Sequence, residues 1–277
     1  MTPDEYCQQK AARSGSSFYY SFLFLPPDRR RAITALYAFC REVDDVVDEC
    51  QDPQIAAAKL AWWRQELASL PDGRPQHPVS QALQAASSQF HLPEEQLAEI
   101  VDGMEMDLRQ SRYLDFKALS LYCYRVAGVV GLLAAQIFGY QDRRTQKYAH
   151  DLGIAFQLTN IIRDVGEDAR RGRIYLPIED LQRFGVTAAD ILNARHSHDF
   201  RRLMEFQIER AESYYTQAIG ALPAVDRKAQ RPGLVMAAIY RTLLEEIRRD
   251  GCQVLSQRTS LTPIRKLWIA WRTWARG

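Results

Sequence analysis

Apolar residues recur every three or four positions along most of this 277-residue chain, the spacing that places them on one face of an α-helix. No convincing run alternates apolar and polar residues, and no two-residue hairpin turn is evident. The pattern therefore predicts an all-α protein. Prolines and glycines divide it: after a short N-terminal helix and a break at 14–17, helices are expected near 27–52, 53–71, 78–91, 94–111, 115–139, 142–170, 198–221 and 232–250, with an extended flap at 174–177.

Three carboxylates interrupt the apolar pattern of the helix expected over 27–52. Asp44 and Asp48 continue the apolar stripe that contains Tyr37, and Asp45 lies beside them. Carboxylates on a buried face repel one another and lose hydration unless basic groups or a metal ion compensate. Oxygen ligands without His or Cys favour Mg²⁺ over zinc. A solvated acidic helix face is the alternative interpretation of this stretch taken alone.

A second polar stripe strengthens the metal interpretation. Gln157, Asn160, Asp164 and Asp168 follow one another at i+3 and i+4 steps, so they share one face of the helix expected over 142–170. If the two acidic helices face each other in a bundle, they can hold several Mg²⁺ ions between them. Each ion would then need anionic oxygens to complete its shell, and a diphosphate is the natural bridging ligand.

Arginines lie beside both acidic stripes. Arg41 precedes the first stripe by one turn, Arg163 lies within the second, and Arg171 and Arg173 follow it. Guanidinium groups form forked hydrogen bonds with phosphate oxygens, so these side chains are candidates for binding the diphosphate. Ordinary salt bridging within a helix is the alternative for Arg41 and Arg163, and solvent exposure is the alternative for Arg171.

The helix expected over 115–139 lies between the two stripes in the sequence. It has aromatic residues toward one end and small residues toward the other. Gly128 and Gly131 permit close approach, either by an apolar ligand chain or by another helix. Tyr122 and Tyr124 favour the ligand. The glycine pair is not a dinucleotide-binding fingerprint, because no strand precedes it and the GxGxxG pattern is missing.

Composition limits the class of protein. With 47% hydrophobic and 25% charged residues and no linker or repeat, the chain is expected to form one domain over residues 1–277. A net charge of +2 argues against nucleic-acid binding. Five cysteines without CxxC spacing and an N-terminus without a visible secretion signal indicate the cytoplasm. The most apolar stretch, 126–135, is about half a membrane span and predicts a core helix.

Five motifs in this chain are those of one known family. They lie at 37–48 (YAFCREVDDVVD), 103–113 (GMEMDL with Arg112 and Tyr113), 122–128 (YCYRVAG), 157–168 (QLTNIIRDVGED) and 172–177 (GRIYLP). In order and spacing, the chain resembles the squalene/phytoene synthase family from about Ser14 to Arg249. Within the family it looks most like the bacterial presqualene diphosphate synthases of the hopanoid pathway.

The resemblance implies a single-domain isoprenoid synthase bundle with a central apolar tunnel. It implies head-to-head condensation of two farnesyl diphosphates to presqualene diphosphate, with release of diphosphate. Squalene, dehydrosqualene or phytoene synthesis are the alternatives within the family. The expected cofactor is Mg²⁺, as several ions bridged by the substrate diphosphate, and NADPH is not expected.

The resemblance also assigns roles to single residues. The break at 14–17 lacks the His and Lys of some relatives, which puts part of the second diphosphate site in doubt. The implied metal ligands are Asp44, Asp45, Asp48, Asn160, Asp164 and Asp168. The substrate site takes in Ser17, Tyr37, Arg41, Gln157, Arg163, Arg173 and Tyr175 together with Gly128 and Gly131, while Tyr122, Tyr240, Arg41 and Arg163 are the candidate catalytic residues.

Other classes of protein fit the sequence less well. A di-metal carboxylate bundle would need Glu-x-x-His pairs, which this chain lacks, and a non-catalytic helical scaffold would leave the acids exposed. The C-terminal segment, about 262–277, spaces three tryptophans among basic residues. It predicts either an interfacial membrane helix or a helix docked on the bundle. A peripheral position at the inner membrane face, beside downstream isoprenoid enzymes, would fit a lipid-like product.

Overall fold

The computed structural model describes residues 1–13, 17–22, 24–50 and 52–276. Within these ranges every regular element is a helix, and extended pairing is limited to an isolated bridge between Arg112 and Ile174. This confirms the all-α fold class that the periodicity predicted. The longer helices are α3 (Pro27–Glu49), α4 (Pro53–Ala68), α5 (Pro78–Phe90), α6 (Glu94–Arg109), α9 (Arg144–Arg170), α12 (His198–Ala221) and α13 (Arg231–Arg249).

Shorter elements connect or cover the long helices. Three of the α-helices among them, α2, α10 and α11, lie in regions for which no helix was expected, because five or six residues are too few to display a helical period. The shorter elements are α1 (Pro3–Arg13), α2 (Ser17–Phe22), α7 (Phe116–Cys123), η1 (Tyr124–Gly128), α8 (Val129–Phe138), α10 (Ile178–Arg183), α11 (Ala188–Leu192), η2 (Ala224–Asp226) and α14 (Pro263–Arg276).

Local chemistry accounts for where the helices begin and end. Proline occupies the first turn of α3, α4, α5 and α13, where a backbone N–H would have no partner within the helix. The Asp52 carboxylate accepts a hydrogen bond from the Gln54 N–H at 2.8 Å and caps α4. His91 takes a left-handed conformation (φ 54°) that ends α5.

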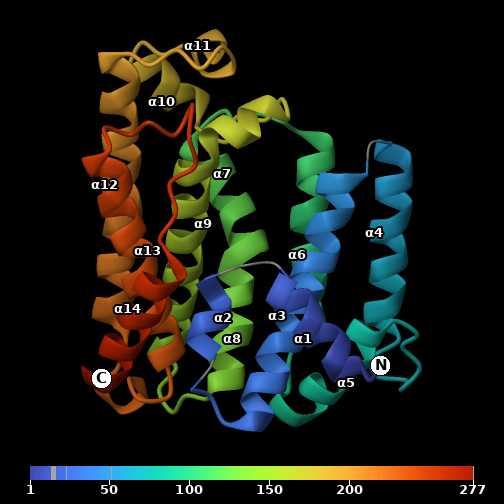
Figure 1. The fold of residues 1–277 in the computed structure, drawn as a ribbon. Coiled ribbons are helices and arrows are strands. Elements are labelled where there is room, and N and C mark those ends of the chain that lie inside the picture. Colours follow the sequence, from blue (N-terminus) through green and yellow to red (C-terminus); the bar gives the residue numbers. More distant parts are fainter. Residues whose placement is uncertain (14–16, 23, 51, 277) are drawn as a thin grey trace.

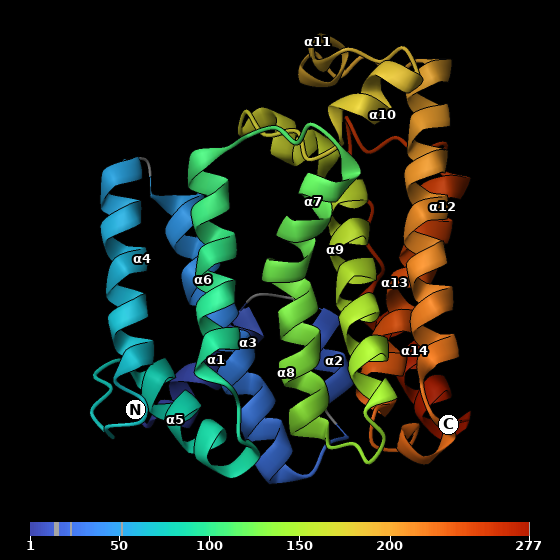
Figure 2. The ribbon, with the colours of Figure 1, turned by 180° about the vertical axis from the view of Figure 1, so that it is seen from behind.

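The central helix α9 organises the bundle. It packs against α8, α12 and α13, and in both views it stands between a group formed by α12, α13 and α14 and a group formed by α3 to α6 (Figures 1 and 2). Two hydrophobic clusters match this division, one built mainly on α9, α12 and α13 and the other on α3 to α6 with α8. The acidic stripes on α3 and α9 therefore belong to two different halves of the core.

The prediction of one uninterrupted α-helix over 115–139 is wrong in one respect. Its middle, η1, is a π-helical turn, a wider turn that shifts the register between α7 and α8. Close packing accompanies it. A Cβ on Gly103 would lie 2.6 Å from a methyl group of Val126, and a Cβ on Gly131 would lie 2.2 Å from the Ala149 carbonyl oxygen. Gly131 therefore lets α8 approach α9, which was the packing interpretation of this glycine.

Phe116–Phe138 is a helical stretch of 23 residues with a mean hydropathy of 1.6. Within the described residues it is the one helix long and apolar enough to cross a membrane. Buried core helices have the same length and composition, and this stretch packs on α6 and α9 and lines the central cavity. We assign it to the core of the bundle.

Candidate active site

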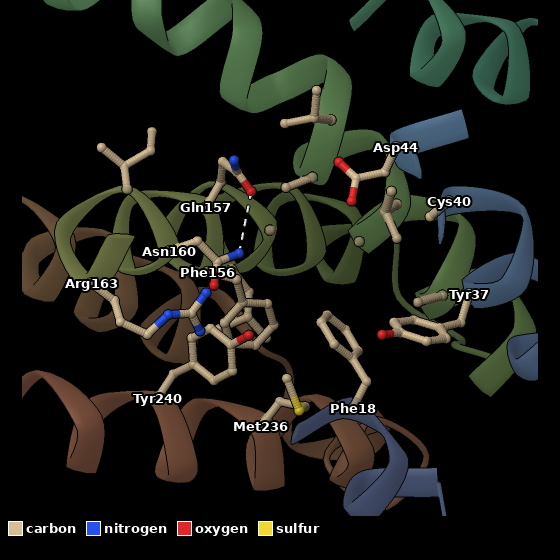
Figure 3. A pocket seen from close by; sticks show the side chains of 18 of the residues that line it. Phe18, Tyr37, Cys40, Asp44, Phe156, Gln157, Asn160, Arg163, Met236 and Tyr240 are labelled. Carbon is tan, nitrogen blue, oxygen red and sulfur yellow. Dashed lines mark hydrogen bonds between the residues drawn. The ribbon is translucent and has the colours of Figure 1, made fainter. Parts of the chain in front are cut away.

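A cavity of about 630 Å³ opens between the two halves of the bundle. Its deeper wall is apolar and comes from α2, α3, α8, α9 and α13. Figure 3 shows side chains of Phe18, Tyr37, Phe156, Met236 and Tyr240 directed toward one another across this space. Other apolar lining residues are Phe22, Ile33, Leu36, Val130, Ala134, Phe138 and Leu152.

The acidic residues of α3 lie where the cavity becomes polar. Arg41 donates through Nη1 to Asp44 Oδ2 and through Nη2 to Asp45 Oδ1, both at 2.5 Å. Asp44 and Asp48 line the cavity, but Asp45 does not. Asp45 instead pairs with Lys10 at 2.8 Å on the α1 side of the helix. The three carboxylates that are adjacent in sequence therefore divide between two faces.

The polar stripe of α9 lies across the cavity from α3. Gln157, Asn160, Asp164 and Asp168 all line the cavity, as their shared face predicted. Asn160 Nδ2 lies 3.4 Å from Gln157 Oε1 (Figure 3). The Asp164 carboxylate accepts hydrogen bonds from Arg163, whose guanidinium group also interacts with the Tyr240 hydroxyl.

Two arginines at the end of α9 connect the acidic stripes. Arg171 Nη1 lies 2.7 Å from Asp48 Oδ2, and Arg173 Nη1 lies 3.1 Å from Asp48 Oδ1. Both arginines line the cavity, so Arg171 is a bridging residue although half of its side chain is exposed. The contacts show that α3 and α9 face each other, which was the condition set for a shared metal and diphosphate site.

The arginines near these carboxylates do not fully offset the effects of burial and of repulsion between the carboxylates. Burial, with the neighbouring carboxylates Asp48 and Asp45, raises the pKa of Asp44 to about 6 in spite of Arg41. Burial and Asp164 raise the pKa of Asp168 to about 7. Burial alone would also raise the pKa of Asp164, but hydrogen bonds from Arg163 and Arg258 outweigh it and lower the pKa. A divalent cation would relieve this repulsion.

The donor groups fit Mg²⁺, because they are carboxylate and amide oxygens without nitrogen or sulfur ligands. Among the described residues, no three His, Cys, Asp or Glu side chains converge into a ready-made metal cage. Metal ligation by Asp44, Asp45, Asp48, Asn160, Asp164 and Asp168 stays a prediction. The geometry favours the other five over Asp45, because Asp45 lies outside the cavity lining and pairs with Lys10.

Asp107 on α6 is a site residue for which the sequence reasoning gave no role. Its carboxylate accepts hydrogen bonds from the Tyr122 and Tyr175 hydroxyls, each at 2.8 Å. The Tyr113 ring tilts against the Tyr122 ring and stacks on the Tyr175 ring, with centroids 5.5 and 5.9 Å away. Burial raises the pKa of Asp107 to about 6. The signal was available, since an acid within the apolar 103–108 motif resembles the acids of α3.

Arg258 and Lys266 also line the cavity and were not predicted. Arg258 Nε lies 2.8 Å from Asp164 Oδ1 and 3.3 Å from Glu167 Oε2. Burial and the nearby charges of Arg163 and Arg258 lower the pKa of Lys266. No sequence signal links these residues to α9, because they follow it by about a hundred positions and reach it only through the fold.

The remaining predicted residues fall into three groups. The Ser17 side chain lies outside the described part of the chain. Gly128 belongs to η1 and lies outside the cavity lining, so only the packing interpretation applies to it. The predicted residues that line the cavity are Tyr37, Arg41, Asp44, Asp48, Tyr122, Gly131, Gln157, Asn160, Arg163, Asp164, Asp168, Arg173, Tyr175 and Tyr240.

The helical bundle and its half-polar, half-apolar cavity define an all-α isoprenoid synthase. Residues 11–265 match the family model described as squalene/phytoene synthase. The chain therefore belongs to the squalene/phytoene synthase family of prenyltransferases, whose members act on prenyl diphosphates.

Curated relatives and solved structures agree on this family. The chain is 37% identical to the 15-cis-phytoene synthase of Synechocystis sp. over 99% of its own length and 85% of that protein. It is 38% identical to the phytoene synthase of Arthrospira platensis, over 95% of its own length and 89% of that protein. A dehydrosqualene synthase structure superposes with a TM-score of 0.89 at 29% identity, with 99% and 96% covered. The structure of the squalene synthase HpnC from Alicyclobacillus acidocaldarius superposes with a TM-score of 0.79 at 30% sequence identity. This match covers 90% of the present chain and 94% of that one.

Proposed function

We propose that this enzyme condenses two farnesyl diphosphates head to head into presqualene diphosphate. The observation that carries the proposal is the meeting of the acidic faces of α3 and α9, through Asp48 and its two arginines, at the polar end of an apolar cavity. A prenyl diphosphate has the matching form, with a dianionic or trianionic head and a long apolar tail. The polar end would hold the diphosphates and the apolar wall the isoprenoid chains.

In the proposed reaction, the C–O bond between the donor's first carbon and its diphosphate breaks, and diphosphate leaves with the electron pair. The resulting allylic cation forms a C–C bond with the acceptor's double bond, and loss of a proton closes a cyclopropane ring. Arg41, Arg163 and Arg173 would donate hydrogen bonds to the departing diphosphate oxygens. When bound, Mg²⁺ would supply charge neutralisation of the leaving group, held by Asp44, Asp48, Asn160, Asp164 and Asp168.

The apolar wall would protect the cation. The rings of Phe18, Phe156 and Tyr240 line the cavity. The Phe156 ring meets the Phe18 ring edge-on, with centroids 6.2 Å apart, and tilts against the Tyr240 ring at 5.1 Å. Aromatic faces stabilise a positive charge and exclude water, which would otherwise trap the cation. Near the acids, Tyr122 donates its hydroxyl proton to Asp107, so its phenolic oxygen is held in a fixed orientation. We propose that Tyr122 turns this hydroxyl from Asp107 to the diphosphate that acts as base, and so orients it.

The choice of a C30 product rests on the motifs at 37–48 and 122–128 together with the similarity to the dehydrosqualene and squalene synthase structures. Phytoene synthesis from a C20 substrate is the second candidate, because the curated relatives named above are phytoene synthases. NADPH is not expected to be needed, since condensation to the cyclopropyl diphosphate involves no reduction. We place the enzyme in the cytoplasm, in contact with the inner membrane face.

One assay separates these possibilities. The purified protein is incubated with farnesyl or geranylgeranyl diphosphate and Mg²⁺, with and without NADPH, and the products are identified by mass. We expect the C30 cyclopropyl diphosphate from farnesyl diphosphate at the same rate in both conditions. Squalene that forms only with NADPH would contradict the proposed end point, and phytoene from the C20 substrate would assign the enzyme to carotenoid synthesis.

A further inference from the structure

The outer face of α14 is apolar, although this helix lies at the edge of the bundle beside α13 (Figure 1). Ile264, Leu267, Trp268 and Trp271 are 82%, 46%, 52% and 60% exposed. At 3.6 residues per turn, these four positions fall within about one third of the helix circumference. A surface helix normally turns polar residues outward, so this stripe indicates a partner that accepts large apolar side chains.

The helix is fixed with this stripe outward. Its inner face carries Ile269 and Ala270, which are buried against the bundle, and it packs on α13 and α2. The Trp274 ring lies 5.1 Å from the Phe24 ring, which follows α2. α14 thus has an inner apolar face that anchors it and a second, outer apolar face. One helix can therefore both dock on the bundle and lie at a membrane surface, the two alternatives for the C-terminal segment. Docking uses the inner face, and the exposed tryptophans lie on the outer face.

The surroundings of the stripe are positively charged. Residues 251–277 contain five basic and no acidic residues, whereas the other 250 residues contain 31 basic and 34 acidic ones. The Arg272 guanidinium group lies over the Trp268 ring, 5.0 Å from its centroid. Arg265 contributes less, because it pairs with Glu246 at 2.7 Å. Tryptophan and arginine together are typical of protein surfaces at the boundary between lipid tails and headgroups.

We propose that the outer face of α14 binds the surface of an anionic lipid bilayer. The indole rings of Trp268 and Trp271 and the side chains of Ile264 and Leu267 would enter the headgroup region, with Arg272 beside the anionic headgroups. The helix would lie in the plane of the membrane, because 14 residues extend only about 21 Å and cannot cross a bilayer.

A second copy of this chain is a poorer occupant. A symmetric dimer would place the same patch on both sides of the interface, so the basic 251–277 segments would face each other without acidic counterparts in either. One stripe along a single 14-residue helix is also narrow for a stable dimer, which typically buries about 800 Å² on each partner. An anionic bilayer meets both requirements, since it supplies apolar depth and negative charge.

The position of α14 relates lipid contact to the cavity. The segment before it, Arg258 to Leu261, and Lys266 within it line the cavity, as do α2 and α13, on which it packs. α14 is therefore an outer layer of the cavity wall. If the proposed function holds, membrane binding would bring this wall next to the phase in which a C30 product dissolves. The lipid-binding proposal itself does not depend on that function.

The test measures binding of the purified full-length chain to sedimented vesicles in the absence of substrate. Vesicles of phosphatidylcholine alone are compared with equimolar phosphatidylcholine and phosphatidylglycerol. We expect binding to the anionic vesicles, and quenching of tryptophan emission by lipids brominated on their acyl chains. The double variant Trp268→Gln/Trp271→Gln should bind at least about tenfold more weakly and lose most of the quenching. Arg272→Gln should weaken binding to anionic vesicles selectively.

Matched controls are available elsewhere on the surface. The double variant Ile55→Gln/Leu192→Gln removes two half-exposed apolar side chains from α4 and α11, and Arg144→Gln removes an exposed arginine. These variants should bind vesicles like the unaltered chain. Circular dichroism and turnover without vesicles should be unchanged in every variant, which separates this proposal from the proposed function.

Three outcomes would overturn the proposal. Equal vesicle binding by the unaltered chain and the tryptophan double variant would exclude the stripe as the contact. Equal binding to neutral and anionic vesicles would exclude the role of charge. A dimer detected by light scattering that the tryptophan variant abolishes, without vesicle binding, would assign the face to a second copy of the chain.

Discussion

Single residues at the cavity mouth combine burial with too little positive charge. Asp44 and Asp168 have raised pKa values because burial and neighbouring carboxylates outweigh the arginines near them. Asp164 differs, since two arginines pair with it and lower its pKa. Additional cations would therefore be stabilised near Asp44 and Asp168. An incoming diphosphate would compete with Asp164 for hydrogen bonds from its two arginines.

The two adjacent acids of α3 should differ in importance. We expect Asp44→Asn to reduce turnover by about a thousandfold, about 4 kcal/mol of barrier, because Asp44 lines the cavity. Asp45→Asn is the matched control and should reduce turnover by less than about tenfold, since Asp45 faces Lys10. Steady-state kinetics at saturating Mg²⁺ and circular dichroism check both variants. Near-normal turnover of folded Asp44→Asn would contradict its proposed metal role.

Asp107 should make stability depend on pH. Its pKa of about 6 in the folded chain is above the ordinary value, so the folded state holds the proton more tightly than the unfolded chain. The contribution of Asp107 to the free energy of unfolding is therefore present at low pH and is lost as pH rises through about 6. Asp107→Asn should make this decline shallower by on the order of 1 kcal/mol, measured by urea unfolding of the metal-free protein on both sides of that pH.

Asp142→Asn is the control for this measurement, because Asp142 is only partly buried and hydrogen bonds from Arg144 lower its pKa. It titrates below the relevant range, so the decline through pH 6 should be unchanged. If Asp107→Asn and the unaltered chain lose stability equally, then Asp107 is ionised in the folded protein throughout this range.

At the scale of helices, small residues determine how closely the central elements approach. A Cβ on Gly153 of α9 would lie 2.3 Å from the Ala127 carbonyl oxygen in η1, and one on Gly131 of α8 would meet the Ala149 carbonyl oxygen of α9. A backbone carbonyl group cannot move away from an added methyl group as the flexible end of a side chain can. These glycines fix the separation between α9 and the η1–α8 segment, which together form part of the cavity wall.

Gly153→Ala should destabilise the protein by about 2–4 kcal/mol, because the added methyl group forces two helices apart. Gly220→Ala is the matched control on α12, where a Cβ would meet no atom within 4 Å. It should leave stability unchanged or raise it by up to about 1 kcal/mol. Thermal unfolding of both variants checks this, and equal midpoints would show that α9 tolerates the shift.

At the scale of the whole molecule, the C-terminal region folds back over the acidic face of α9. The Gly166 N–H donates to the Val254 carbonyl oxygen at 3.1 Å, and Arg258 then reaches Asp164 and Glu167. Residues about ninety positions apart thereby share one site. The same segment leads into α14, so the mouth of the cavity and the apolar outer stripe are parts of one connected region.

Arg258→Gln should raise the KM for the proposed substrate, farnesyl diphosphate, by about tenfold, the effect of one charge-assisted hydrogen bond to phosphate. The fold should be retained, because Arg163 still pairs with Asp164. Arg201→Gln, which removes an exposed arginine paired within α12, is the control and should leave KM unchanged. An unaltered KM in Arg258→Gln would restrict this residue to holding the C-terminal segment in place.

The helices and the acidic stripes could be predicted from the order of residues alone. Helical periodicity and proline positions depend on nearest neighbours along the chain, so α3, α9 and the shared face of Gln157, Asn160, Asp164 and Asp168 could be predicted. The same local logic could not separate Asp45 from Asp44. Which of two adjacent side chains faces the cavity depends on Lys10 in another helix.

Features that join distant segments became visible in the folded chain and not before. The π turn η1 packs against both α6 and α9, Asp107 acquires its environment from tyrosines on two other segments, and Arg258 reaches α9 from the far end of the chain. The two faces of α14 likewise have the same apolar composition in the sequence. Which of them is buried against the bundle and which is left for lipid is set by the shape of the surface on which the helix docks.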